Sequence, residues 1–172
     1  KVTNEIVITA ASDEKVYDSS NVLEDINYFV ESYSEIELQE LIKTFGLNVE
    51  VLKKHYSELS NGEIKKVLLI IAFLSNKKIL LLDDVTAGLD LKGKKTLIKQ
   101  LKKVKREGII IFLSSTDTDF ILEAADNILC INDRKIKIEK DKYNFFSNKS
   151  VLNKCNIAMP KILEFKNVVL KR

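Results

Sequence analysis

The stretch LSNGEIKKVLLIIAFLSNKKILLLDDVTAGLD, residues 59–90, decides the fold because it orders a polar loop, a helix, a strand and a second polar loop. Ser60 and Glu63 have the spacing of a capping box, which predicts the start of a helix. Residues 67–74 of that helix are apolar nearly all round, which indicates burial. Residues 79–82 are a continuous apolar run, as is typical of a parallel strand covered on both faces.

Strands and helices alternate on both sides of this stretch. Ser34 and Glu37 have a second capping-box spacing, and Gly46 is placed to end the helix that they begin. The other predicted strands are residues 5–9, 109–113, 127–131 and 135–138, of which 109–113 and 127–131 are expected to be buried and 135–138 to be an antiparallel edge. The other predicted helices are a segment from Val22, residues 91–107 and 118–126, and a tail after Pro160. The order predicts an α/β layered fold.

Composition narrows the class of protein. The 172 residues are 45% apolar and 31% charged, a balance typical of a globular domain, and the net charge of +3 is too small to favour nucleic acid as a partner. The basic run from Lys92 to Arg106 is most simply a solvated helix face, with anionic lipid or an acidic partner as alternatives. Cys130 and Cys155 lie far apart in sequence, so we expect neither a metal site nor a disulfide, and a reducing cytoplasm fits.

Two acids follow the strand predicted at residues 79–82. A buried strand that ends in Asp83 delivers a carboxylate to the edge of the sheet where α/β folds bind ligands. Because Mg²⁺ prefers oxygen ligands and keeps several waters, Asp83 is a candidate to hold it through its water shell. Asp84 is a candidate to orient an attacking water. The alternative is that the pair merely begins a turn.

The helix start at Ser60 is a candidate anion site. Unpaired N–H groups and the helix dipole favour a negative charge there, and Asn61 and Gly62 allow the backbone to approach a ligand closely. Taken alone, the pattern is also that of an ordinary helix cap.

Together these motifs, in this order and spacing, resemble the ATPase domain of ABC transporters. Leu59–Glu63 is similar to the signature motif, Ile79–Asp83 to the Walker B strand, and residues 87–90 to the D-loop. In the family, the signature motif of one domain meets the γ-phosphate held by the P-loop of the other. The resemblance implies this role in trans for Ser60, Asn61, Gly62 and Glu63, and a D-loop made of Ala87, Gly88, Leu89 and Asp90.

The resemblance also implies an organisation of the whole chain. We expect a P-loop NTPase-type core with parallel strands in residues 1–20 and 76–145, the ABC helical subdomain in residues 21–75, and a small helical appendix in residues 146–172. The appendix resembles that of energy-coupling-factor (cobalt/vitamin uptake) ATPases, including the step at Met159–Pro160. A rival interpretation is that the last residues begin a second ATPase domain.

One motif of the family is absent from the sequence. No segment fits the P-loop pattern, whose backbone N–H groups cradle phosphates. Residues 88–96, GLDLKGKKT, have the glycine spacing, but Lys95 stands where a hydroxyl should follow the lysine, and Asp90 would place a negative charge in the cradle. We therefore expect the chain to be the C-terminal portion of a longer polypeptide, or to be complemented by another chain.

Three further positions depart from the family's catalytic pattern. Asp84 replaces the catalytic glutamate with a shorter side chain, and Thr116 replaces the switch histidine. The family's glutamine would fall at Ala10 or Ala11, neither of which can bind Mg²⁺ or water. The single histidine, His55, is interpreted as a surface or packing residue.

The sequence is compatible with two main functions. In the first, the chain is an ATP-binding subunit that uses ATP and Mg²⁺ to drive an energy-coupling-factor-like transporter, with its own hydrolytic site degenerate. It pairs with a second ABC ATPase subunit, identical or different, beneath a membrane-embedded component, at the cytoplasmic face of the membrane. In the second, it is a non-catalytic partner that supplies the signature motif in trans. A soluble ATPase of repair or translation is a weaker third candidate.

Overall fold

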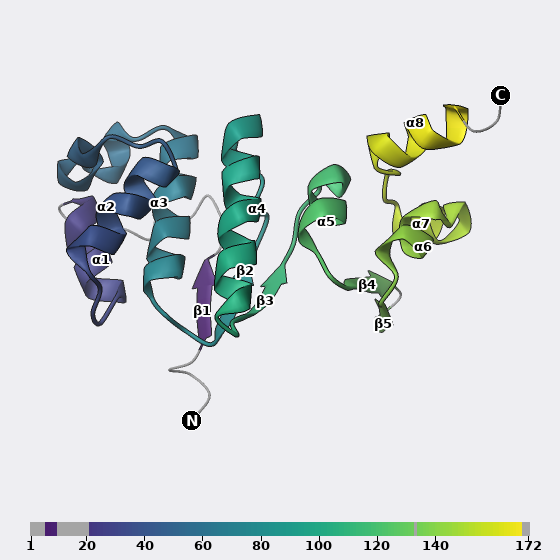
Figure 1. The fold of residues 1–172 in the computed structure, drawn as a ribbon, viewed down its shortest axis with the longest axis horizontal. Helices are drawn as coiled ribbons and strands as arrows, with labels where there is room; N and C mark the ends of the chain where they lie inside the picture. Colours follow the sequence, from purple (N-terminus) through teal and green to yellow (C-terminus); the bar gives the residue numbers. More distant parts are fainter. Residues whose placement is uncertain (1–5, 10–20, 133, 170–172) are drawn as a thin grey trace. The chain divides into compact units, whose positions relative to one another are not determined.

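The computed structural model describes residues 6–9, 21–132 and 134–169 (Figure 1). These residues belong to two compact units, residues 1–115 and residues 116–172. The boundary differs from the predicted subdomain boundaries near residues 75 and 145, which stay predictions.

A parallel sheet organises the first unit. Its strands are β1 (Ile6–Thr9), β2 (Ile79–Leu82) and β3 (Ile110–Leu113), with β2 in the centre. Ile79 pairs with Ile6 on one side and with Ile110 on the other. The predicted parallel strands are therefore confirmed for these three segments, and their carboxyl ends share one edge of the sheet.

The predictions of burial for β2 and β3 have different outcomes. Leu80 and Leu82 of β2 are 1% and 2% exposed, as expected for a central strand. In contrast, Ile110 and Phe112 of β3 are 55% and 52% exposed, so the prediction that residues 109–113 are buried on both faces is wrong here. The reason is that β3 has a single strand neighbour, β2, among the described residues.

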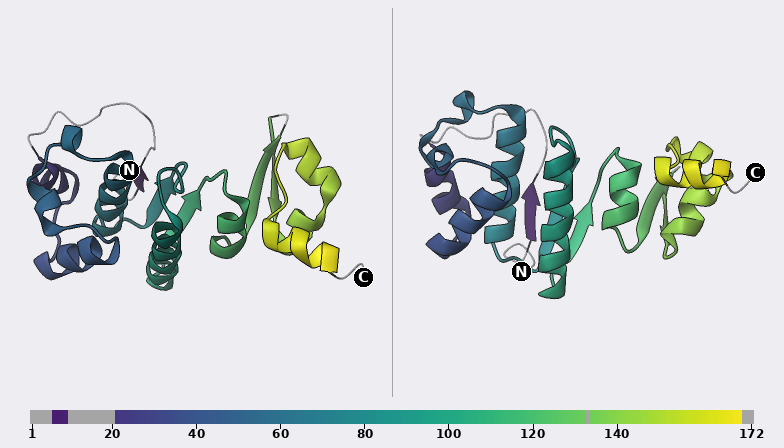
Figure 2. Two further views of the ribbon diagram at one scale, coloured as in Figure 1. Left: turned by 90° about the horizontal axis from the view of Figure 1, so that it is seen from above. Right: turned by 45° about the horizontal axis from the view of Figure 1, so that its top comes forward.

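Helices α1 to α3 gather at one side of this sheet, and α4 lies beside the strands (Figures 1 and 2). Helix α3 contacts α1, α2 and β1, and its residues 67–74 are all buried, which confirms the predicted buried helix. The helical segments are α1 (Val22–Phe29), α2 (Glu35–Thr44), the 3-10 turns η2 (Val49–Lys53) and η3 (Tyr56–Glu58), α3 (Asn61–Leu74) and α4 (Leu91–Arg106).

The two predicted capping boxes differ. At α3 the box is present in full: the Ser60 side chain accepts from the Glu63 N–H, and the Glu63 carboxylate accepts from the Ser60 N–H. At α2 the box predicted from Ser34 and Glu37 is wrong, because the Ser34 side chain makes no cap hydrogen bond. Helix α2 still begins at the next residue, since its apolar face is buried against α3.

The second unit is a hairpin with helices around a small core. Strands β4 (Ile128–Asn132) and β5 (Lys135–Glu139) pair antiparallel, as predicted for the second of them. The helices are α5 (Thr118–Ala124), α6 (Lys142–Ser147), α7 (Lys149–Cys155) and α8 (Lys161–Val169). The core consists of Leu122, Ile128, Phe145, Phe146 and Leu152. Helix α8 begins directly after Pro160, as predicted for the helical tail.

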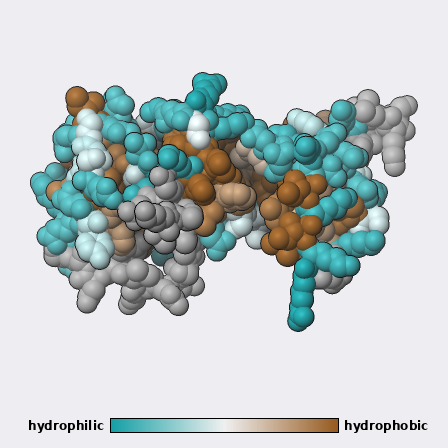
Figure 3. Space-filling model, turned by 90° about the horizontal axis from the view of Figure 1, so that it is seen from below, coloured by the Kyte–Doolittle hydropathy of each residue, from teal (hydrophilic) through white to brown (hydrophobic). Residues whose placement is uncertain are grey.

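Strand β4 was expected to be buried, and the structure contradicts this. Leu129 and Ile131 are 45% and 69% exposed, and they stand opposite Ile138 and Ile136, which are also exposed. Within the described residues β4 pairs with β5 alone, so one face of the hairpin lacks a cover. Figure 3 shows apolar, brown surface in both units.

In the part of the chain that the structure describes, no helix combines the length and hydropathy needed to cross a bilayer.

The N-cap of α4 is predicted to stabilise the protein, and substitution of Asp90 tests this. Asp90 accepts a hydrogen bond from the Gly93 N–H at 2.7 Å. We expect Asp90→Ala to lower the free energy of unfolding by about 1 kcal/mol, the usual contribution of such a cap. Asp90→Asn should retain most of it. Urea unfolding followed by circular dichroism measures the change.

Ser34→Ala is the matched control, because Ser34 also occupies an N-cap position but makes no cap hydrogen bond with its side chain. We expect it to change the free energy of unfolding by less than about 0.5 kcal/mol. Equal losses for Asp90→Ala and Ser34→Ala would show that the Asp90 contact does not stabilise α4.

Candidate functional site

A tight turn follows β2 and carries the two predicted carboxylates. Asp83 is exposed, and Asp84 is half-buried with a φ of +42°, in the left-handed region that Asp tolerates better than most residues. The Ser114 hydroxyl, at the end of β3, donates to Asp83 Oδ1 at 2.5 Å and accepts from the Asp84 N–H at 2.8 Å. Both acids are thus tied to the neighbouring strand.

Lys65 connects the same turn to α3. The Lys65 side chain is buried, with 6% of the residue exposed, and its Nζ donates to the Asp83 main-chain oxygen at 3.1 Å. Burial lowers the pKa of the Lys65 ammonium, and the nearby carboxylates of Asp84 and Asp83 oppose the shift. The start of α3 and the end of β2 therefore form one connected element.

The residues that resemble the signature motif lie at the accessible start of α3. Ser60 and Asn61 are exposed, and Gly62 and Glu63 are half-buried. The Ser60 hydroxyl donates to Glu63 Oε2 at 2.9 Å. Hydrogen bonds from Ser60, first from its N–H and then from its hydroxyl, lower the pKa of the Glu63 carboxyl. An incoming anion would compete with this carboxylate for the Ser60 hydroxyl.

Two glycines allow the start of α3 to touch the loop before α4. A β-carbon added at Gly62 would lie 2.8 Å from the Gly88 carbonyl oxygen, closer than real contacts permit. Gly88 has a φ of +72°, which L-residues with side chains rarely adopt. The backbone contact therefore needs glycine at both positions, and it brings the predicted signature residues and the predicted D-loop together.

Residues 88–96 are not a phosphate-binding loop in this structure. They form the end of a turn and the first part of α4. The Gly93 N–H, which a phosphate would use, is already bonded to the Asp90 carboxylate. This contact supports the rejection of GLDLKGKKT as a P-loop.

Thr116, Ala10, Ala11 and His55 are the remaining positions singled out in the sequence. Thr116 is exposed and opens the second unit, whereas Ser60–Glu63, Asp83, Asp84 and residues 87–90 all belong to the first. Ala10 and Ala11 lie outside the described residues. His55 is exposed, and its N–H donates to Glu58 Oε2, which fits a surface role.

The sequence did not identify two residues of the cluster, Ser114 and Lys65. Ser114 follows a parallel strand just as Asp83 does, so its place at the carboxyl edge of the sheet was a usable signal. Lys65 carried a weaker signal, because it is one of two adjacent lysines that directly precede the apolar run of residues 67–74.

The donor set at this edge fits a hard cation. Two carboxylates and a hydroxyl offer oxygen atoms, which are the ligands that Mg²⁺ prefers. Within the described ranges, no group of three or more His, Cys, Asp or Glu side chains is placed to hold a metal ion. The oxygen donors are compatible with a hydrated hard cation, for which Asp83 is the protein contact that the sequence predicts.

Cys130 and Cys155 are neighbours in the second unit despite their separation in sequence. Both are half-buried free thiols that hydrogen bond to each other. Burial, reinforced by this hydrogen bond, raises the pKa of Cys130 to about 11. Because the thiolate is the reactive form, the raised pKa makes the Cys130 thiol a poor nucleophile at neutral pH.

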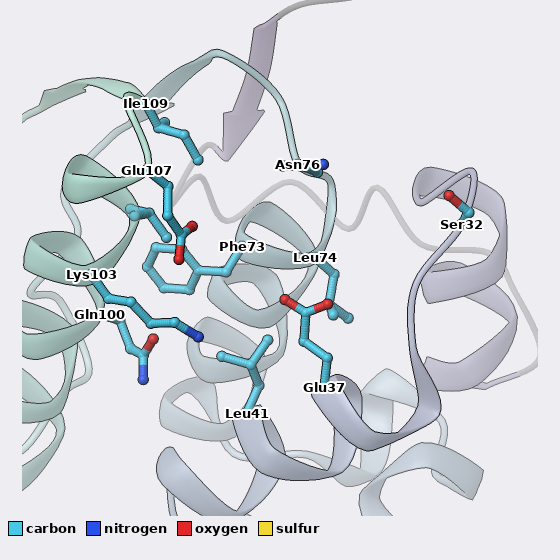
Figure 4. Close-up of a pocket in the computed structure, with 11 residues that line it drawn as sticks. Ser32, Glu37, Leu41, Phe73, Leu74, Asn76, Gln100, Lys103, Glu107 and Ile109 are labelled. Atoms are coloured by element: carbon cyan, nitrogen blue, oxygen red, sulfur yellow. The ribbon is translucent and has the colours of Figure 1, made fainter.

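A pocket of about 170 Å³ lies between α2, α3 and α4 (Figure 4). Leu41, Phe73 and Leu74 line it, together with Glu37 and Lys103. Asn76 and Ile109 also line it, and these residues precede β2 and β3. The pocket is therefore at the opposite end of the strands from Asp83 and Ser114, and it is separate from the candidate site.

The buried lysine predicts a pH dependence of stability. Since the pKa of Lys65 is lower in the folded protein, the unfolded chain binds this proton more tightly, and folding is favoured as the proton is lost. We expect the free energy of unfolding of the wild type to rise relative to that of Lys65→Met as pH increases toward 10.5, the ordinary lysine value. Urea titrations at several alkaline pH values measure the difference.

Lys66→Met controls for loss of a lysine from the same turn of α3, since Lys66 is more exposed than Lys65. Parallel pH profiles for the wild type and Lys65→Met would contradict the assigned burial of the Lys65 charge.

Comparisons with known proteins identify the family of the chain. The family model described as ABC transporter matches residues 2–87, half of the chain. A Clostridium acetobutylicum protein described as an ABC transporter ATP-binding protein is 32% identical over 165 residues, with 92% of this chain and 58% of that protein covered. The energy-coupling factor transporter ATP-binding protein EcfA2 of Streptococcus agalactiae is 27% identical over 150 residues, with 84% and 54% covered.

Solved structures show the same fold. The structure of CbiO1 from Clostridium perfringens, described as part of the ABC transporter complex CbiONQ, aligns with a TM-score of 0.66 at 24% identity, over 96% of this chain and 68% of that one. This chain spans somewhat more than half the length of the two relatives above, 58% and 54%. The matched motifs, the fold and the family model together show that the chain belongs to the ABC transporter family.

Proposed function

We propose that the chain is part of the ATP-binding subunit of an energy-coupling-factor-type ABC transporter, which couples ATP binding and hydrolysis to transport. The observation that carries the proposal is the contact between the start of α3 and the predicted D-loop, where Gly62 lies against Gly88. A second contact, from the Lys65 ammonium to the Asp83 carbonyl, joins the helix that begins at Ser60–Glu63 to the Asp83 turn. The similarity to EcfA2 proteins supports the transporter type.

In this proposal Ser60, Asn61, Gly62 and Glu63 act in trans, on ATP held by the P-loop of a second ABC ATPase subunit. Their accessible position at a helix start, where N–H groups favour an anion, supports the role. Asp83 would hold Mg²⁺ through its water shell, and Mg²⁺ would neutralise charge on the phosphates. The pair of subunits would lie at the cytoplasmic face of the membrane, beneath a membrane-embedded component.

A second candidate is a non-catalytic partner that completes the site of the other subunit. Two residues favour it: Asp84, whose side chain is shorter than glutamate, and Thr116, which cannot become cationic. The left-handed backbone at Asp84 adds a constraint, because that conformation suits Asp better than Glu. Both candidates use the residues of the signature and D-loop in the same way, so they differ in the chemistry at Asp84.

The role in trans predicts the effect of one substitution. Ser60→Arg places a bulky side chain where the partner's nucleotide would lie. We expect it to lower ATP turnover of the natural complex by at least about tenfold, consistent with the loss of a group that positions charge in the reaction. A coupled ADP-release assay on the purified complex measures turnover.

Ser57→Arg is the matched control, since Ser57 is exposed, lies three residues earlier and would receive the same charge. Its turnover should equal that of the wild type. Because Ser60→Arg also removes a cap, unfolding midpoints of both variants must show that the complex remains folded at the assay temperature. Unchanged turnover in a folded Ser60→Arg complex would refute the role in trans.

The two candidates separate at Asp84. If Asp84 is a poorly placed base, Asp84→Glu should raise turnover, since a well-placed base contributes about 10²- to 10⁴-fold. Asp84→Asn should show none of this rise, while it keeps the left-handed turn. Single-turnover measurements on the natural complex report the chemical step. If Asp84→Glu leaves the rate unchanged while its unfolding midpoint matches that of the wild type, so that the turn tolerates Glu, the defect lies elsewhere and the non-catalytic candidate gains support.

A further inference from the structure

We propose that Ser114 is a positioning residue, whose hydroxyl orients the Asp83 carboxylate and fixes the Asp84 backbone so that this edge of the sheet can receive Mg²⁺. The inference rests on the proposed function, because it assigns a positioning residue to Asp83, the carboxylate that would hold the ion. No motif of the sequence identified this residue, and it is assigned from its contacts.

The hydrogen bonds of Ser114 have a defined direction. A hydroxyl has one proton, and the Asp84 N–H already donates to its oxygen at 2.8 Å. The hydroxyl proton is therefore committed to Asp83 Oδ1, 2.5 Å away. A hydrogen bond from a hydroxyl to a carboxylate is charge-assisted and stronger than one between neutral groups. It restricts rotation of the Asp83 side chain before any ion arrives.

The backbone of Ser114 is itself held in place. Its N–H donates to the Leu82 carbonyl at 2.9 Å, and its carbonyl accepts from the Val85 N–H at 3.1 Å. These bonds continue the parallel pairing of β2 and β3 past the last ladder pair, Leu82 with Leu113. The Ser114 hydroxyl is therefore presented from a fixed strand end, and ordering it costs little further entropy.

The turn that Ser114 supports is conformationally unusual. Asp84 has a φ of +42°, and a residue other than glycine in this region needs support from its surroundings. The Ser114 hydroxyl satisfies the Asp84 N–H, and the Lys65 ammonium satisfies the Asp83 carbonyl. Ser114 thus differs from Lys65 in one respect: its hydroxyl contacts a carboxylate oxygen as well as the backbone.

Ser115 offers a close comparison. Its hydroxyl lies 2.5 Å from the Thr86 hydroxyl, and Thr86 is 5% exposed. The same side chain, one residue further along, thus supports the same segment through the Thr86 hydroxyl. A purely structural role would make Ser114→Ala and Ser115→Ala behave alike.

The test uses the natural polypeptide with its partner subunits and Mn²⁺ as a spectroscopic substitute for Mg²⁺. Binding of Mn²⁺ in the presence of a non-hydrolysable ATP analogue is followed by electron paramagnetic resonance, and the Mg²⁺ concentration for half-maximal ATP turnover is measured separately. We expect Ser114→Ala to weaken Mn²⁺ binding and raise the Mg²⁺ requirement by about three- to tenfold, the size of one hydrogen bond. Ser114→Thr, which keeps the hydroxyl, should remain within about twofold of the wild type.

Three kinds of result would overturn the inference. The first is wild-type metal affinity in Ser114→Ala, and the second is an equal loss of affinity in Ser114→Ala and Ser115→Ala. In either case, weak Mn²⁺ binding by Asp83→Asn would show that the proposed function survives and that Ser114 alone was misassigned. The third is the absence of ATP-dependent Mn²⁺ binding in the wild type, or wild-type binding by Asp83→Asn, which would remove the proposed role of Asp83 and that of Ser114 with it.

Discussion

The parallel pairing of β2 with β3 is the constraint on which the rest of the site depends. Because both strands run the same way and end at Leu82 and Leu113, the residues that follow them emerge side by side. Asp83 and Ser114 are 31 positions apart in sequence and are joined by a hydrogen bond. A register shift of one residue would turn each side chain to the other face of the sheet and separate the carboxylates from the hydroxyl.

The second constraint is the close approach of α3 to the loop before α4. Gly62 and Gly88 meet backbone to backbone, so a displacement of the helix must move the loop, or open the contact. The buried ammonium of Lys65 extends this coupling to the Asp83 carbonyl. An anion that binds at Ser60 would therefore act on an element already joined to the turn that carries Asp83 and Asp84.

Local patterns in the sequence predicted the elements well, and contacts between distant segments explain the failures. The strand at residues 79–82 and the capping box at Ser60 could be predicted because hydrophobic periodicity, segment length and capping depend on residues that are close together in the sequence. Ser34 has the same local spacing as Ser60 but makes no cap bond, so spacing permits a cap without requiring it. Burial of β3 and β4 depends on which strands stand beside them, and the neighbourhood of Cys130 and Cys155 depends on how α7 packs on β4. Neither the burial of a strand nor the proximity of the two cysteines can be predicted from a short stretch of sequence.

Asp84 is where structure and proposed chemistry conflict most directly. A general base must reach its water, and Asp reaches about one methylene less far than Glu. Yet the turn holds this residue at a φ of +42°, where a short polar side chain is favoured. The residue is therefore well suited to the turn and less well suited to the reaction. The turn also serves Asp83, because the Ser114 hydroxyl that satisfies the Asp84 N–H is the one that orients the Asp83 carboxylate. Under either proposal, a chain that lost hydrolysis at Asp84 would still need this turn to hold the proposed metal ion and to connect β2 with the predicted signature residues. Retention of the turn is thus compatible with both proposed functions, and the reach of a single carboxylate distinguishes them.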